Sequence, residues 1–128
     1  MPLEHITFAP EGEKSPYSDL VILDNRELHL SGLIAMDLDT EELRYGTVTE
    51  ETRLILNNLS TLLERHGSDM DHVVRATVLL SDFSERDEMN AEYVRHFHPR
   101  RLPARLCFGN VGLHGKCKVE IAVTAVKR

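Results

Sequence analysis

The last apolar stretch of the chain alternates like a half-buried β-strand, and this pattern constrains the fold more than any other feature. One face of the predicted strand carries Val119, Ile121, Val123 and Ala125, and the other carries Lys118, Glu120, Ala122 and Thr124. The second face turns small after Glu120, so we expect this carboxylate at the mouth of a partly dry space. A carboxylate in such a place is either paired or kept for chemistry.

An isolated arginine precedes this strand in the chain. Arg105 follows Pro103 and Ala104 at the start of another extended segment. It is the obvious candidate partner for Glu120, unless it binds a substrate carboxylate instead. A structural Arg105–Glu120 pair that closes a sheet is an equally open alternative from these residues alone.

Length and charge limit the classes of protein that the chain can belong to. We expect its 128 residues to form one domain, residues 1–128, with 41% hydrophobic and 28% charged residues. A net charge of −6 argues against a nucleic-acid partner, and we interpret the basic run from Arg95 to Arg101 as a solvated loop. No apolar run approaches the roughly 18 residues of a membrane span. The N-terminus has no signal-peptide pattern, so we expect a cytoplasmic protein without a membrane partner.

Cysteines and histidines give no metal or disulfide pattern. Cys107 and Cys117 are too few for a disulfide scaffold and lack C-x-x-C spacing. His96 and His98 could be two metal ligands, but no third ligand is apparent nearby, so we predict no metal site. The glycine-rich run from Gly109 to Gly115 lies between predicted strands and is interpreted as a turn, not a phosphate site.

The order of predicted elements is two strands, a helix, a strand, a second helix and two strands. Extended segments are predicted at residues 19–23, 27–34, 74–80, 106–109 and 117–126, and Asp24-Asn25 predicts a hairpin turn. In the third segment Val74, Ala76, Val78 and Leu80 form the alternating apolar face.

Two helices complete the pattern. The first, over residues 47–67, has a capping box from Thr47 to Glu50 and ends at Gly67. For the second helix we expect Ser84 as the N-cap, an end before Pro99, and an inner face made of Met89, Tyr93, Val94 and Phe97. These elements predict a two-layer α+β sandwich with both helices on one face of a mixed sheet. The other face also carries apolar residues, which predicts a homo-oligomer.

Seven segments follow one another in a recognisable order. They are Ser15-Pro16-Tyr17-Ser18, Ser31-Gly32, the helix at 47–67, the strand at 74–80, Met89-Asn90-Ala91-Glu92-Tyr93, Pro103-Ala104-Arg105 and Val119-Glu120-Ile121-Ala122-Val123. In this order they resemble the RidA/YjgF/UK114 family of reactive-intermediate deaminases. The resemblance covers residues from about 15 to the C-terminus. It implies a chorismate-mutase-like fold, a homotrimer, and three sites in the clefts between subunits. It also implies hydrolysis of 2-imino or 2-enamine acids, such as 2-aminoacrylate and 2-iminobutyrate, to 2-keto acids and ammonia without a cofactor or metal.

The resemblance also implies roles for individual residues. Arg105 matches the arginine that binds the substrate carboxylate, a role suited to a planar, permanently charged guanidinium. Glu120 matches the glutamate that positions or activates the attacking water, and Tyr17 a tyrosine of the cleft. Further substrate-binding positions correspond to Ser31, Leu33, Asn90 and Cys107.

Four positions depart from the family pattern. Ser15 stands in place of a glycine, Leu33 in place of a glutamine, Leu106 in place of a small hydroxyl residue, and Ala122 in place of a second glutamate. Ser15 and Leu33 put the choice of substrate in doubt more than the chemistry. A second hypothesis is a non-catalytic trimer that binds small carboxylates, such as keto acids, through Arg105.

Overall fold

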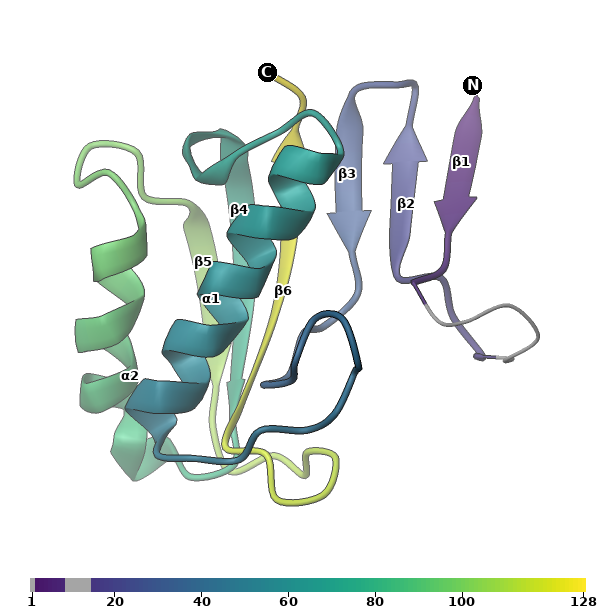
Figure 1. Ribbon diagram of the computed structural model, residues 1–128. Helices are drawn as coiled ribbons and strands as arrows, with labels where there is room; N and C mark the ends of the chain where they lie inside the picture. Colours follow the sequence, from purple (N-terminus) through teal and green to yellow (C-terminus); the bar gives the residue numbers. More distant parts are fainter. Residues whose placement is uncertain (1, 9–14) are drawn as a thin grey trace.

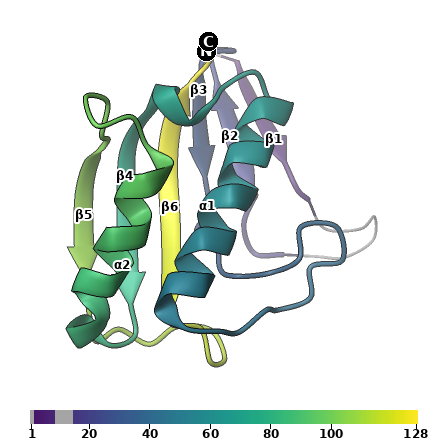
Figure 2. The same ribbon diagram turned by 60° about the vertical axis from the view of Figure 1, so that its left-hand side comes forward.

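The structure, a computed structural model, describes residues 2–8 and 15–128; residue 1 and residues 9–14 of the predicted domain lie outside it. In the described residues six strands form one sheet, and two α-helices pack on one of its faces (Figures 1 and 2). The strands are β1 (Leu3–Ile6), β2 (Leu20–Leu23), β3 (Glu27–Leu30), β4 (Val73–Leu80), β5 (Ala104–Phe108) and β6 (Val119–Val126). The helices are α1 (Val48–Arg65) and α2 (Arg86–Tyr93), with short 3₁₀ turns at Met70–His72, Phe83–Glu85 and Val94–His96. The two-layer α+β prediction is confirmed.

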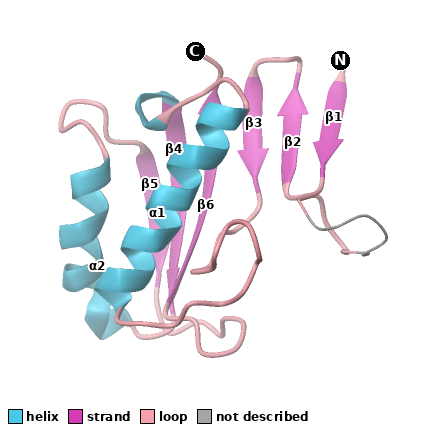
Figure 3. Ribbon diagram, viewed as in Figure 1, coloured by secondary structure: helices cyan, strands magenta, loops and turns pink. Residues whose placement is uncertain are grey.

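The sheet is mixed, as predicted. Its strand order is β1-β2-β3-β6-β4-β5, which leaves β1 and β5 as the two edges. Strands β4 and β5 pair in parallel and every other described pair is antiparallel. A long irregular connection, pink in Figure 3, leads from β3 to α1 and passes below the end of β3.

The hairpin between β2 and β3 is the one that Asp24 and Asn25 predict. Both residues have positive φ, 58° and 52°, which is the backbone of a type I′ turn. Aspartate and asparagine tolerate this left-handed conformation better than other non-glycine residues.

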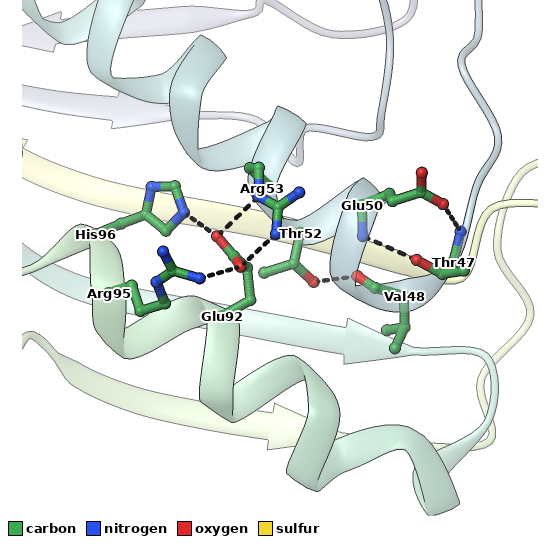
Figure 4. A network of polar contacts seen from close by, with 8 residues as sticks. All are labelled: Thr47, Val48, Glu50, Thr52, Arg53, Glu92, Arg95 and His96. Carbon is green, nitrogen blue, oxygen red and sulfur yellow. Dashed lines mark hydrogen bonds and ion pairs between the residues drawn. The ribbon is translucent and has the colours of Figure 1, made fainter.

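Helix α1 begins and ends where the sequence predicts. The Thr47 hydroxyl accepts a hydrogen bond from the Glu50 backbone N–H at 3.1 Å, and the Glu50 carboxylate accepts one from the Thr47 N–H at 2.9 Å (Figure 4). Gly67 has a φ of 81° just after the helix, a conformation that favours glycine. The buried face of α1 covers the sheet with Val48, Ile55, Leu56, Leu59, Leu62 and Leu63.

A cluster of charged residues holds α2 against α1; we call it the α1–α2 clamp and define it as Arg53, Glu92, Arg95 and His96 (Figure 4). Glu92 is only 4% exposed. Its carboxylate accepts from Arg53 Nη2 at 3.0 Å and lies 2.7 Å from His96 Nε2. Burial alone would raise the pKa of Glu92, but hydrogen bonds from Arg53 and His96 outweigh it and hold the pKa below its ordinary value.

The start and inner face of the second helix differ from the prediction. Ser84 is not the cap: its backbone N–H donates to the Asp82 carboxylate at 2.9 Å, which starts a 3₁₀ turn ahead of α2. Asp82 is the better acceptor there because its carboxylate is charged. Val94 is 48% exposed, since the chain tightens into a 3₁₀ turn after Tyr93 and the helical period is lost.

Three strand predictions also need correction. β1 was not predicted, because its residues are mostly exposed and show no apolar alternation, yet it pairs with β2. A bulge between Val73 and Arg75 in β4 buries Val73 and leaves Val74 47% exposed. The segment predicted at 27–34 ends as a strand at Leu30, and only an isolated bridge at Leu33 follows.

Candidate functional site

The sheet register places Arg105 and Glu120 on opposite faces of one chain. Arg105 pairs with Ala76, which is buried beneath the helices, whereas Glu120 pairs with Leu79. Directly paired residues share a face, and positions three apart along a strand lie on opposite faces. Arg105 therefore lies on the helix-covered face, and Glu120 lies on the open face.

The structural Arg105–Glu120 pair, one of the two alternatives that the sequence left open, therefore does not form within one chain. The Arg105 guanidinium lies instead over the ring of Tyr93. Lys118, the cation nearest to Glu120 in sequence, donates to the Gly46 carbonyl at 2.6 Å. Within the part of the chain that the structure describes, no ion pair involves Glu120. Its carboxylate is left available to a ligand or to another copy of the chain.

Glu120 lines a cavity of about 900 Å³, which we call the Glu120 cavity. The sequence-predicted residues Tyr17, Ser31 and Leu33 line the same cavity, as does Ser15. Its other lining residues are Phe8, Asp19, Gly32, Ile34, Met36, Leu38, Glu41, Leu43, Asn58, Leu62 and His114. The volume falls within the usual range for small-molecule sites.

Gly32 lets the Glu120 carboxylate lie directly against the backbone. A Cβ at position 32 would overlap the side chain of Glu120. The Ser31-Gly32 motif is thus explained by close approach, because any larger residue would push the carboxylate away. The motif therefore limits where the Glu120 carboxylate can lie in the cavity.

Ser31 connects β3 to the segment that carries Tyr17. Its hydroxyl donates to the Ser18 carbonyl at 2.7 Å, and its backbone N–H donates to the Asp19 carbonyl at 2.9 Å. Tyr17 itself is 59% exposed at the cavity. Ser31 therefore holds the Tyr17 segment in place, and its hydroxyl oxygen can still accept a hydrogen bond.

Leu33 lies at the boundary between the cavity and the core. It exchanges two backbone hydrogen bonds with Ile121, at 2.7 and 3.0 Å, so the two residues share a face. Ile121 is buried on the helix-covered face, and Leu33 packs against the core on that side. Its side chain is consequently on the opposite side of the sheet from the Glu120 carboxylate.

A buried glutamate anchors the start of β6, two residues before Glu120. Glu51 of α1 is 1% exposed and accepts from the backbone N–H groups of Lys118 and Gly46, at 2.9 and 3.1 Å. The Lys118 ammonium lies 3.8 Å from the same carboxylate. One side chain thus ties together α1, the end of the long connection and the strand that carries Glu120.

The remaining predicted site residues are Arg105 and Cys107, on the helix-covered face of β5, and Asn90 of α2, the helix that also carries Met89 and Tyr93. We call this group the Arg105 cluster and define it as Met89, Asn90, Tyr93, Arg105 and Cys107. The guanidinium carbon of Arg105 lies 4.7 Å from the centroid of the Tyr93 ring, and Nη1 is 4.0 Å from the Met89 sulfur. Cys107 projects from the same face two residues later and packs against the core.

Two polar atoms of this cluster are buried without a partner among the described residues. They are Oδ1 of Asn90 and the hydroxyl oxygen of Tyr93. Burial raises the pKa of Tyr93, although the charge of Arg105 opposes the shift. Buried polar atoms are normally satisfied, so unpartnered ones near a charged group indicate a place where a ligand or another chain completes the bonding.

Two of the positions that depart from the family pattern, Leu106 and Ala122, lie on the open face. Leu106, 45% exposed, lies on this face together with Phe108, 50% exposed. Ala122 pairs with Thr77 and lies on the same face as Glu120. Glu120 is therefore the only acid of β6, and two large apolar side chains stand exposed on β5.

The sequence did not reveal every member of the Arg105 cluster or every residue that lines the Glu120 cavity. Tyr93 and Met89 were predicted only as the inner face of a helix, because their contact with Arg105 depends on a parallel strand pairing that one sequence does not reveal. His114, Asn58 and Phe8 line the Glu120 cavity but lie far apart in the sequence, and no motif marks them.

Residues 2–8 and 15–128 offer no group of three or more His, Cys, Asp or Glu side chains arranged to hold a metal ion. His96, considered as a ligand in the sequence, belongs to the α1–α2 clamp instead. No helix formed by the described residues has the length and apolar character needed to cross a membrane.

Fold and site together define a small α+β protein with a ligand-sized cavity beside an exposed sheet face. A sequence profile of the endoribonuclease L-PSP family matches residues 9–127. The human 2-iminobutanoate/2-iminopropanoate deaminase is 34% identical over 116 residues, which cover 91% of this chain and 83% of the human protein. The RutC family protein UK114 of Drosophila melanogaster is 35% identical over 112 residues, 88% of this chain and 80% of the fly protein.

Solved structures agree over nearly the whole chain. A YjgF-family protein of Neisseria meningitidis is 30% identical and superposes with a TM-score of 0.82, covering 100% of this chain and 97% of the other. Yeast Mmf1 is 27% identical with a TM-score of 0.85 and coverages of 99% and 100%. The chain therefore belongs to the endoribonuclease L-PSP family, the group that contains the proteins named YjgF, RidA and UK114.

Proposed function

We propose that this protein hydrolyses 2-imino acids and their 2-enamine tautomers to 2-keto acids and ammonia. The observation that carries the proposal is a set of relatives, 34–36% identical over most of the chain, that are named 2-iminobutanoate/2-iminopropanoate deaminase. The Glu120 cavity and the Arg105 cluster supply the two charges that such a substrate needs.

Arg105 is assigned to the substrate carboxylate. Its guanidinium offers a planar pair of N–H donors that match a carboxylate, and it stays charged at every working pH. This contact orients the imine carbon for attack. The unpartnered Oδ1 of Asn90, on the neighbouring helix, is available to accept from the substrate's nitrogen or from water.

Glu120 is assigned to the attacking water. The substrate reacts as its protonated iminium form, and Glu120 takes a proton as the water oxygen bonds to the iminium carbon, which gives a neutral carbinolamine. The resulting carboxylic acid then protonates the amino nitrogen, the C–N bond breaks, and the hydroxyl proton returns to Glu120 as the ketone forms. The released ammonia takes this proton and leaves as ammonium together with the 2-keto acid, which restores the Glu120 carboxylate. An enamine first gains a proton from solvent at its terminal carbon, which gives the same iminium form. This scheme needs no metal or cofactor.

A site that uses both residues requires two copies of the chain, because one copy carries them on opposite faces of its sheet. We propose the homotrimer that the family resemblance implies, with a site in each of three clefts. Two observations support it: β5, which carries Arg105, is an edge strand, and Leu106 and Phe108 stand exposed on its open face. Each cleft would combine Glu120 of one copy with Arg105 of a neighbour.

The alternative is a non-catalytic trimer that binds 2-keto acids through Arg105. Both hypotheses need the same arginine, so only turnover separates them. The family name includes endoribonuclease, but a net charge of −6 is unfavourable for RNA, and we propose no nucleic-acid partner. Two free cysteines, Cys107 and Cys117, fit a reducing compartment, so we propose a cytoplasmic location.

The test couples an amino-acid oxidase, which forms the 2-imino acid, to semicarbazide, which traps it. A deaminase lowers semicarbazone formation by removing the imine first. We expect the wild type to do so with imines from several amino acids, while Arg105→Ala at the same concentration does not. Unchanged semicarbazone formation, together with measurable keto-acid binding, would favour the binding-only alternative.

A further inference from the structure

The Arg105 guanidinium contacts the ring of a buried aromatic residue, Tyr93. Tyr93 is 3% exposed, and its ring packs under the Arg105 guanidinium at 4.7 Å. Its hydroxyl has no hydrogen-bond partner among the described residues. A buried hydroxyl without a partner costs stability, so the ring, not the hydroxyl, accounts for what the residue contributes here.

The contact has the geometry of a cation–π interaction. Such contacts form within about 6 Å of a ring centroid and become stronger where water is excluded. The Met89 sulfur, 4.0 Å from Nη1, lies beside the same guanidinium. No ion pair with an acidic side chain restrains Arg105 within the described ranges. Its fork thus remains available to a ligand while the ring restricts the plane in which it lies.

We propose that Tyr93 is a positioning residue that orients Arg105 to receive a carboxylate. A flexible arginine loses side-chain entropy when it binds, and a ring that already fixes the guanidinium plane reduces that loss. The proposal rests on the proposed function, because it assigns the substrate carboxylate to Arg105. It adds a residue that acts on the substrate through Arg105.

Stepwise fluorination of the ring at position 93 tests directly whether the attraction between the ring face and the Arg105 charge matters. Tyr93→Phe serves as the reference, and phenylalanines with one, two and three ring fluorines at position 93 keep the shape while weakening the negative ring face. Titration with 2-oxobutanoate measures affinity for a carboxylate, and 2-oxobutanamide is the uncharged control ligand. We expect the carboxylate affinity to fall stepwise with fluorine number and the amide affinity to stay constant.

Removal of the ring gives the larger effect. Tyr93→Leu should weaken 2-oxobutanoate binding about 3- to 30-fold, the range that corresponds to a cation–π contact. Phe97→Leu is the matched control, because Phe97 is also buried and its ring centroid lies 4.8 Å from that of Tyr93, whereas the cation–π contact of Arg105 is with Tyr93. It removes the aromatic ring next to Tyr93 and should leave the affinity within about twofold.

The mobility of the Arg105 side chain can be measured without any ligand and tests the positioning role independently. ¹⁵N relaxation of the Arg105 Nε–H should report an ordered group in wild type and in Phe97→Leu, and a mobile one in Tyr93→Leu. Equal order in all three proteins, or equal carboxylate affinity across the fluorine series, would overturn the positioning role. If Tyr93→Leu makes the Arg105 Nε–H mobile but Arg105→Ala binds 2-oxobutanoate as tightly as wild type, Tyr93 orders the guanidinium, and the assignment of the carboxylate to Arg105 is rejected.

Discussion

The two faces of the sheet differ in what covers them and in the charge that each presents. The helix-covered face holds Arg105, stacked on a buried tyrosine. The open face holds Glu120 beside a cavity, with Leu106 and Phe108 exposed nearby. Under the proposed function one chain therefore contains two half-sites, one with the carboxylate-binding Arg105 and the other with the proton acceptor Glu120.

The contrast follows from strand geometry. In β5 and β6 successive side chains alternate between faces, so a shift of one residue in either strand would bring both charges to the same face. The observed register excludes this, since Arg105 pairs with buried Ala76. The comparison therefore makes a second copy of the chain a requirement of the proposed mechanism.

The largest expected effect is on the helix-covered half-site. Arg105→Ala should abolish measurable turnover, because a lost charged contact costs about 2–5 kcal/mol and the substrate is no longer oriented. Circular dichroism and light scattering should show an unchanged fold and assembly. A folded variant with full activity would mean that another group binds the carboxylate.

The open half-site should respond in a different kinetic parameter. Glu120→Gln keeps the size and reach of the side chain but cannot accept the proton. The kcat should fall about 10²–10⁴-fold, the usual contribution of general acid–base catalysis. KM should change little, since Arg105 still binds the substrate. Steady-state kinetics of the wild type and Glu120→Gln measure both parameters. An unchanged kcat would mean that another group activates the water.

The α1–α2 clamp keeps α2 over the Arg105 cluster, and its stability should depend on pH. Glu92→Gln leaves Arg53 and His96 without a buried anion and should cost about 1–3 kcal/mol of unfolding free energy at pH 7. The pKa of Glu92 is lowered in the folded state, so its stabilisation is present above the ordinary glutamate pKa of about 4.3 and is lost as the pH falls further.

Urea unfolding of both proteins at pH 7 and below pH 4 measures this difference. The difference in unfolding free energy between wild type and Glu92→Gln should become smaller at the lower pH, because the wild-type Glu92 carboxylate becomes protonated. A gap of the same size at both pH values would show that Glu92 acts through its shape and not through its charge.

The smallest effect is expected at Leu33. The departure from glutamine predicts a preference for imines with larger apolar side chains, in the range of about 1–3 kcal/mol for small pocket changes. Because Leu33 packs on the helix-covered side, we expect the lower end of this range. Leu33→Gln should raise kcat/KM for 2-aminoacrylate relative to the leucine-derived imine; unchanged ratios would remove Leu33 from the specificity argument.

Local signals predicted most of the fold. The capping box at Thr47, the turn at Asp24-Asn25 and the alternation of β6 depend on neighbouring residues, and each is confirmed. The bulge at Val73 and the exposed strand β1 were not predicted, because both depend on pairing with distant strands.

For the candidate site, too, some features could be predicted from the sequence and others depend on contacts between distant strands. The strand pattern singled out Arg105 and Glu120, and the family resemblance implied their roles. The Ser31-Gly32 motif is explained by a distant contact, the close approach of the Glu120 carboxylate to Gly32. That the two charges lie on opposite faces could not be predicted, because it depends on the parallel register of β4 and β5. The Tyr93–Arg105 contact was missed for the same reason.

Mixed assemblies test the two-copy site most directly. Arg105→Ala and Glu120→Gln chains, carrying different affinity tags, are co-expressed, and assemblies that contain both tags are purified in two steps. Light scattering first checks that wild-type protein has a mass near three times 14.6 kDa. In any mixed trimer, one cleft of the three joins an intact Glu120 to an intact Arg105 of its neighbour. The account predicts that turnover returns to about one third of wild type; mixed trimers as inactive as either parent would contradict it.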